Sequence, residues 1–381
     1  MNPKIRKTIG YFGTFFLLGA VISSLGPTID GLAENVGREA PQLSFLFSFR
    51  AVGYLSGALL GGVLYQRFPG HKVLAGILLL MAGILFFTPA VGALALLIPF
   101  LIGTGLSCGA MDVGSNTMLA FTHQDSSGPY LNAMYLFAGI GSFLAPLYLG
   151  FVSLSWGYRG LALLVLPAAL WMLITPSPAI RSVDDGTQQA GFRPDILVLF
   201  MLLSFFTIGL EVSYSGWIYT YQQQLFPAST QMGYYLTSVF WAGITMGRLT
   251  AIPAAARLKA PRMIFTFLGG GLISTIMLIA LAEVPWALWA GTAGVGLSLA
   301  ALFPTAFGYI QRIANLTPRQ NGIVWASGST GSIVLPWLVG WQIGASGPRA
   351  MMVIQMLAWI SALIIFAVLY LRQMLHKRKH R

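Results

Sequence analysis

The stretch "FFLLGAVISSLG" at residues 15–26 recurs in altered form as "FFTIGLEVSYSG" at residues 205–216. The two copies share both phenylalanines, two glycines and one serine. A second pair, "GTGLSCGAMD" at residues 103–112 and "GVGLSLAALF" at residues 294–303, lies at nearly the same offset. That common offset is about half of the 381 residues. The chain is therefore predicted to consist of two related halves.

The amino-acid composition is that of a membrane protein. Of the residues, 56% are hydrophobic and only 8% are charged, whereas a soluble domain carries about 25% charged residues. Apolar runs of about 20 residues, the length that a helix needs to cross a bilayer, recur from end to end. They lack the strict alternation of a membrane β-barrel, so helices must satisfy the backbone groups. The sequence predicts an all-α integral membrane protein with twelve transmembrane helices. The predicted spans cover residues 9–31, 43–65, 73–88, 91–121, 130–153, 159–175, 196–221, 232–256, 263–282, 285–311, 321–344 and 350–372.

Lysine and arginine are distributed unevenly over the predicted loops. With the N-terminus inside, most of the 22 basic residues fall in cytoplasmic segments, and the outer loops hold only Arg38, Arg159 and Arg349. Because basic loops stay on the cytoplasmic side, we expect both termini in the cytoplasm and the protein in the inner (plasma) membrane. The same bias accounts for the net charge of +12. We expect membrane lipid, and no nucleic acid, as the partner of the basic tail "HKRKHR".

The duplication divides the chain into three parts. We predict an N-terminal six-helix half at residues 1–175, a polar, proline-rich cytoplasmic linker at 176–194 and a C-terminal six-helix half at 195–381. Both halves enter from the cytoplasm, so the repeats are parallel, as in transporters whose halves rock around a central site. The sequence contains no metal-ligand cluster, nucleotide-binding loop or catalytic triad. The leading prediction is a monomeric transporter that works by alternating access, is not an enzyme and needs no cofactor besides a coupling ion.

Away from the ends of the predicted spans, four charged residues remain inside them, namely Arg50, Asp112, Glu211 and Arg248. A charge at the bilayer centre costs about 2.5–3.5 kcal/mol, so each of them needs a partner or a wet cavity. In the duplication Asp112 aligns with Phe303. Glu211 likewise aligns with Val21. Because each twin position is apolar, the architecture itself does not require these acids, and they are predicted to serve the specific function.

Each membrane acid has a polar neighbour on the same helix face. Asp112 lies four residues before Asn116, and Glu211 lies four residues before Ser215. An ionised carboxylate accepts hydrogen bonds, while an amide both donates and accepts them, a combination that suits the hydroxyls of a sugar. A carboxylate can also hold Na⁺ or H⁺ in one state and release it in another. We predict all four residues as substrate ligands, and the two acids also as cation-coupling groups.

Other interpretations stay open. Trp217 and Trp325 are predicted to offer flat surfaces to sugar rings, although tryptophans in membrane proteins often serve packing or the lipid interface. Arg50 and Arg248 are predicted to act in gating or in charge pairs, and an acid paired with either would fix a conformation without touching substrate. A proton-coupled exporter of amphipathic compounds or lipid uses the same fold and remains the alternative function.

Three segments carry a family resemblance. They are "GLEVSYSGWIYTY" at residues 209–221, "AMDVGSNTML" at 110–119 and "ALFPTAFGYI" at 301–310. They resemble the fucose–proton symporter and sodium-dependent glucose transporter branch of the major facilitator superfamily. The resemblance implies a sugar–cation symporter whose central cavity is lined by the first, fourth, seventh and tenth spans. We therefore expect a secondary transporter that imports a hexose-like sugar together with Na⁺ or H⁺.

Overall fold

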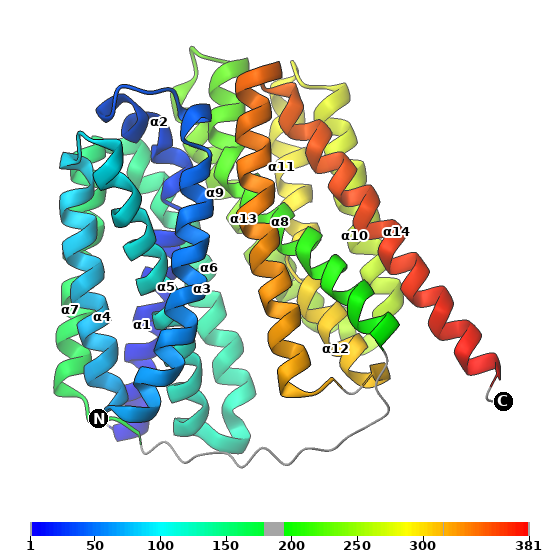
Figure 1. The fold of residues 1–381 in the computed structure, drawn as a ribbon, viewed down its shortest axis with the longest axis horizontal. Helices are drawn as coiled ribbons and strands as arrows, with labels where there is room; N and C mark the ends of the chain where they lie inside the picture. The colour runs from blue at the N-terminus through cyan, green and yellow to red at the C-terminus, as the bar shows by residue number, and fades with distance from the viewer. Residues whose placement is uncertain (1, 179–193, 315, 380–381) are drawn as a thin grey trace. The chain divides into compact units, whose positions relative to one another are not determined.

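The computed structural model describes residues 2–178, 194–314 and 316–379 (Figure 1). Within these residues the regular structure is helical throughout, with no strand. The chain forms two compact units, Met1–Val183 with Ser229–Ser238, and Asp184–Ala228 with Val239–Arg381. The predicted boundaries at 175 and 195 stay predictions, because most of the predicted linker lies outside the described residues. The all-helical fold class is confirmed.

The first unit is built on seven α-helices and three short 3-10 helices. The α-helices are α1 (Pro3–Ile22), α2 (Leu25–Asn35), α3 (Phe45–Arg67), α4 (Gly70–Phe87), α5 (Leu94–His123), α6 (Ser127–Phe151) and α7 (Leu154–Ile174). The 3-10 helices are η1 (Ala40–Leu43), η2 (Thr88–Ala90) and η3 (Gln124–Ser126). Within this unit α3 packs along α5, α1 along α6, and α4 along α7.

The second unit contains the remaining helices. They are α8 (Pro194–Leu225), α9 (Thr230–Arg257) beyond its first turns, α10 (Ala260–Ala280), α11 (Pro285–Leu299), α12 (Leu302–Ala314), α13 (Pro318–Ser346) and α14 (Arg349–Lys379). Here α13 packs along α8, and α10 packs against both α11 and α14.

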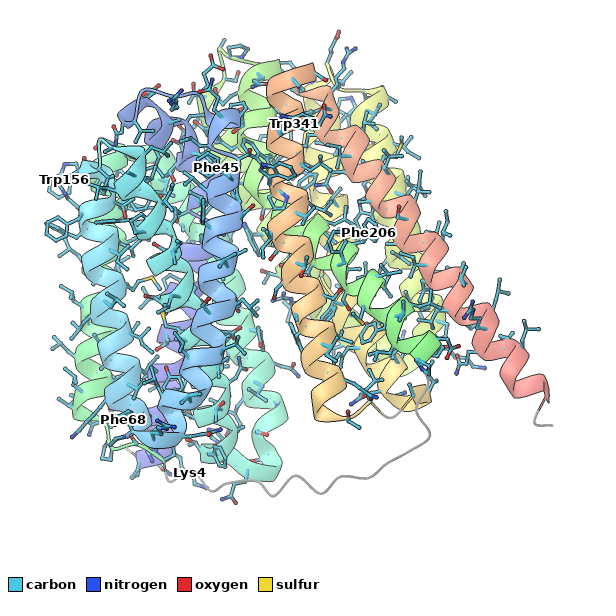
Figure 2. The ribbon with its side chains drawn as sticks, viewed as in Figure 1. Lys4, Phe45, Phe68, Trp156, Phe206 and Trp341 are labelled. Carbon is cyan, nitrogen blue, oxygen red and sulfur yellow. The ribbon has the colours of Figure 1, made fainter. Side chains whose placement is uncertain are left out.

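The helices coincide with the predicted spans. Among the described residues, eleven helical segments are long and apolar enough to cross a membrane. The predicted span at 232–256 coincides with α9, whose polar residues exclude it from those eleven. The side-chain view shows Lys4 and Phe68 at one end of the first unit and Trp156 at the other (Figure 2).

Two predicted spans are broken rather than continuous. The span at 9–31 divides into α1 and α2 at Ser23 and Ser24, and the span at 285–311 divides into α11 and α12 at Ala300 and Ala301. At the first break both serine hydroxyls donate to backbone carbonyls of the preceding turn, at 3.2 and 2.8 Å. Such side-chain bonds compete with the regular helical pattern, which gives the local reason for this interruption.

Candidate functional site

Asp112 lies at the centre of a hydrogen-bonded cluster in the first unit. The hydroxyl of Tyr54, on α3, donates to Oδ2 of Asp112. The amide nitrogen of Asn116, one turn further along α5, donates to Oδ1 at 2.7 Å. Both carboxylate oxygens therefore have a donor, and the predicted neighbourhood of Asp112 and Asn116 is present in the structure.

The cluster extends to a third helix through Asn116. Its amide nitrogen lies 3.2 Å from the hydroxyl of Tyr135, on α6. The ring of Tyr135 meets that of Phe15, on α1, edge to face with centroids 5.2 Å apart. Asp112 and Asn116 are half-buried and Tyr135 is exposed. Among the described residues, no donor reaches the amide oxygen of Asn116.

The close approach of α3 and α5 positions Tyr54 against Asp112. A Cβ atom on Gly105 would overlap the carbonyl oxygen of Arg50, and one on Gly109 would overlap that of Tyr54. Small residues at such positions let two membrane helices approach until their backbones touch. The glycines of α5 therefore set the distance across which the Tyr54 phenol reaches the carboxylate.

Arg50 lies one turn before Tyr54 on α3. Its guanidinium donates to the carbonyl oxygen of Ile22, the last residue of α1, at 3.1 Å. The carbonyl end of a helix carries partial negative charge and attracts cations. Among the described residues, no ion pair joins Arg50 to Asp112. The structure thus gives this arginine a backbone partner at the break between α1 and α2.

Glu211 and Ser215 lie on α8 in the second unit, and both are half-buried. The Ser215 hydroxyl donates to the carbonyl of Val212 within its own helix, at 3.2 Å. Arg248, on α9, lies near enough to Glu211 for the two charges to attract one another. Arg248 also donates from Nε to the carbonyl of Ala300, at the break between α11 and α12, at 3.4 Å. The predicted association of Glu211 with Arg248 is therefore compatible with the structure.

The two predicted stacking tryptophans differ in environment. Trp217 is 0% exposed, and its indole nitrogen donates to the carbonyl of Pro336, on α13, at 2.7 Å. A fully enclosed ring offers no face to a sugar, so in this conformation Trp217 packs α8 against α13. Trp325 is 53% exposed, and its ring meets Phe303 edge to face at 4.9 Å. Trp325 therefore retains an accessible aromatic surface.

Sequence reasoning missed Tyr54 and Tyr135. Both lie in predicted spans, where a buried phenol normally finds a hydrogen-bond partner. That rule singles out tyrosines in spans as candidates, but it does not say which acid they meet. Only the packing of α3 and α6 beside α5 assigns them to Asp112 and Asn116.

Comparisons with known proteins place this geometry in context. The sequence profile of the Major Facilitator Superfamily matches residues 11–336. The sodium-dependent glucose transporter 1A of Mus musculus is 26% identical, and the match covers 86% of this chain and 88% of that protein. The major facilitator superfamily domain-containing protein 4A of Mus musculus is 23% identical, covering 99% of this chain and 94% of that protein.

Solved structures show the same fold. The nucleoside transporter NupG superposes with a TM-score of 0.78 at 13% identity, covering 97% of this chain and 99% of that one. A D-xylose–proton symporter superposes with a TM-score of 0.76 at 13% identity, covering 94% and 97%. At such low identity these likenesses concern the fold, not the cargo.

Proposed function

Because the chain belongs to the major facilitator superfamily, a family of membrane transporters, we propose that it imports a hexose-like sugar together with Na⁺ or H⁺. Transport proceeds by alternating access, in which the site opens first to one side of the membrane and then to the other. Asp112 and Asn116 bind the sugar hydroxyls, and Asp112 also holds the coupling cation. Glu211 is the second carboxylate of the cycle.

One observation carries the proposal, namely that side chains of Tyr54 and Asn116, and no described arginine, donate to the Asp112 carboxylate. An acid tied to an arginine is already neutralised, whereas an acid held by neutral donors remains free to bind a cation. The cluster also offers what a polyol needs, because carboxylate, amide and phenol groups together supply both acceptors and donors.

Coupling follows from the energetics of a buried charge. An uncompensated carboxylate inside the membrane is costly, so an enclosed site is unfavourable while Asp112 is bare. Binding of Na⁺ or H⁺ removes the net charge and makes closure around the sugar favourable. A ligand shifts a conformational equilibrium only by its differential affinity for the two states, and the cation supplies that difference.

The relatives support the choice of a sugar and a cation. The Mus musculus relative is named as a sodium-dependent glucose transporter. A Homo sapiens relative, named sodium-dependent glucose transporter 1, is 25% identical, and the match covers 94% of this chain and 77% of that protein. These names concern those proteins, and identities of this order leave the sugar and the ion to experiment.

Uptake into proteoliposomes tests the proposal. Labelled hexoses are offered under an inward Na⁺ gradient, an inward proton gradient, or no gradient. The Glu283→Gln variant is a matched control, because it removes an exposed carboxylate that pairs with Arg349 at 3.2 Å, outside the Asp112 cluster. We expect one gradient to drive accumulation of a hexose in both wild type and control. If correctly inserted protein accumulates no hexose under either gradient, the sugar proposal fails and the exporter becomes the better interpretation.

A further inference from the structure

An apolar groove runs between α4 and α7 in the first unit. It encloses about 210 Å³ and its lining is wholly apolar, with Leu79, Gly83 and Phe86 on one wall and Leu163 and Leu166 on the other. The four of these residues other than Gly83 are large hydrophobic residues that the protein leaves exposed. The groove is therefore an open trough on the flank of the first unit.

The groove lies towards one end of the unit. Gly83 is about 20 Å along α4 from Gly70, given a rise of 1.5 Å per residue. Leu163 lies in the first half of α7, and this helix begins at Leu154, two residues before Trp156. Trp156 is at the end of the unit opposite Lys4 (Figure 2). By the positive-inside rule the Lys4 end is cytoplasmic, so the groove faces the outer half of the membrane.

A cation without a polar partner stands at the outer end of the groove. The guanidinium of Arg159, one turn before Leu163, lies over the ring of Phe86, 5.4 Å from its centroid. Its Nε is buried and has no hydrogen-bond partner among the described residues. No described carboxylate pairs with Arg159 either. A cation at the membrane boundary normally finds a counter-charge, and no described residue provides one here.

We propose that this groove binds a glycerophospholipid, with one acyl chain along the trough and the phosphate at Arg159. An arginine fork fits phosphate geometry well and forms charge-assisted hydrogen bonds. Trp156, 63% exposed at the start of the same helix, is the type of residue that marks the headgroup level. The apolar lining and the cation thus match the two ends of one lipid molecule.

Two glycines of α4 provide a matched pair of variants. A Cβ atom built on Gly83 would meet no atom within 4 Å, and the same holds for Gly76. The two positions are about two turns apart on one helix face. Only Gly83 lines the groove. Gly83→Leu therefore places a side chain in the trough from a position with room for its Cβ, and Gly76→Leu makes the same change on that face outside the trough.

Native mass spectrometry of the purified full chain tests the proposal. The protein is titrated with 1-palmitoyl-2-oleoyl phosphatidylglycerol and, separately, with the corresponding diacylglycerol, which lacks the phosphate. We expect wild type and Gly76→Leu to bind phosphatidylglycerol equally well. Gly83→Leu, which excludes the acyl chain, and Arg159→Gln, which removes the charged donor, should each weaken binding about tenfold. Diacylglycerol should bind wild type about tenfold more weakly than phosphatidylglycerol does.

Several results would overturn the proposal. If the Gly83→Leu and Gly76→Leu variants bind phosphatidylglycerol equally well, the acyl chain does not lie in the groove. If Arg159→Gln binds phosphatidylglycerol as well as wild type does, or if wild type binds diacylglycerol and phosphatidylglycerol equally well, Arg159 does not contact the phosphate. A dimer that only Gly83→Leu dissociates would assign the groove to a second copy of the chain. The Arg159→Gln variant keeps the test decisive if Gly83→Leu does not fold.

Discussion

At Asp112 two neutral donors from different helices hold one carboxylate. Tyr54 reaches across from α3 and Asn116 reaches back along α5. This arrangement orients the acid without neutralising it, which a charge pair with an arginine would do. In the proposed mechanism Asp112 responds to Na⁺ or H⁺ while these two hydrogen bonds hold it in position.

Replacing Tyr54 with phenylalanine removes one of the two donors to Asp112. Hydrogen bonds to charged groups contribute about 1.5–3 kcal/mol, so we expect Tyr54→Phe to weaken sugar binding about tenfold or more. Tyr148→Phe is the matched control, because its hydroxyl donates to the carbonyl of Trp156 at 2.7 Å, far along α6 from Tyr135. The sugar affinities of the two variants are compared with that of wild type by isothermal titration calorimetry. Equal affinities of the two variants would contradict the role of Tyr54.

The sequence predicted part of this site and missed part. Asp112 and Asn116 were predictable as neighbours because a spacing of four residues fixes their relation on any helix. Tyr54 and Tyr135 were not, since the distance from Tyr54 to Asp112 and that from Tyr135 to Asn116 depend on how three helices pack. Trp217 shows the opposite kind of error. Its aromatic ring suggested a surface on which a sugar could stack, but in the structure the ring is fully buried.

At the scale of elements, the contact of α3 with α5 determines the geometry of the site. A Cβ on Gly109, on α5, would overlap the carbonyl oxygen of Tyr54, on α3, whereas one on Gly62, on α3, would meet nothing within 4 Å. Overfilling a tight contact destabilises a protein by about 1–3 kcal/mol. We expect Gly109→Ala to lower the Tm measured by thermal unfolding in detergent, and Gly62→Ala to leave it nearly unchanged. Identical Tm values would show that the helices do not rely on this contact.

The helix breaks give the membrane arginines a structural role. Arg50 donates to the carbonyl of Ile22 at the end of α1, and Arg248 donates to that of Ala300 at the end of α11. Continuous apolar runs predicted single helices here, because hydropathy does not register an interrupted backbone. The serines at the first break are a local signal, whereas Ala300 and Ala301 at the second break give none.

The role of Arg50 can be separated from that of an ordinary surface charge. Arg50→Met leaves the partly buried Ile22 carbonyl without its donor, which costs about 1–3 kcal/mol of stability. Arg349→Met removes only an exposed ion pair with Glu283, worth about 0–1 kcal/mol. We therefore expect a clearly larger loss of thermal stability for Arg50→Met. Equal losses would mean that Arg50 does not stabilise the break.

At the scale of the whole molecule, the long apolar runs correctly predicted an all-helical fold, whereas the domain boundaries and the orientation in the membrane stay predictions. Long apolar runs fix the helices because the bilayer leaves the backbone few alternatives. The eighth predicted span, at α9, shows where hydropathy alone is a weak guide, since its polar residues make it less apolar than the other predicted spans. Its 28 residues nevertheless form one continuous helix.

The predicted topology is open to a direct check. Glu283 and Lys259 are both exposed, and the positive-inside rule places them outside and inside, respectively. The single native cysteine, Cys108, is buried and is not expected to react. We expect a membrane-impermeant maleimide to label Glu283→Cys on intact cells and Lys259→Cys only after permeabilisation. The reverse labelling pattern would show that the protein has the opposite orientation in the membrane.

The central claim is that one carboxylate, Asp112, makes sugar binding depend on a cation. The most direct measurement is sugar affinity as a function of Na⁺ concentration and of pH, for wild type and for Asp112→Asn. The account predicts that wild-type affinity rises with one of the two cations and that Asp112→Asn, neutral in every condition, loses this dependence. If the variant shows the same cation dependence as wild type, the account is contradicted and the coupling group is a residue other than Asp112.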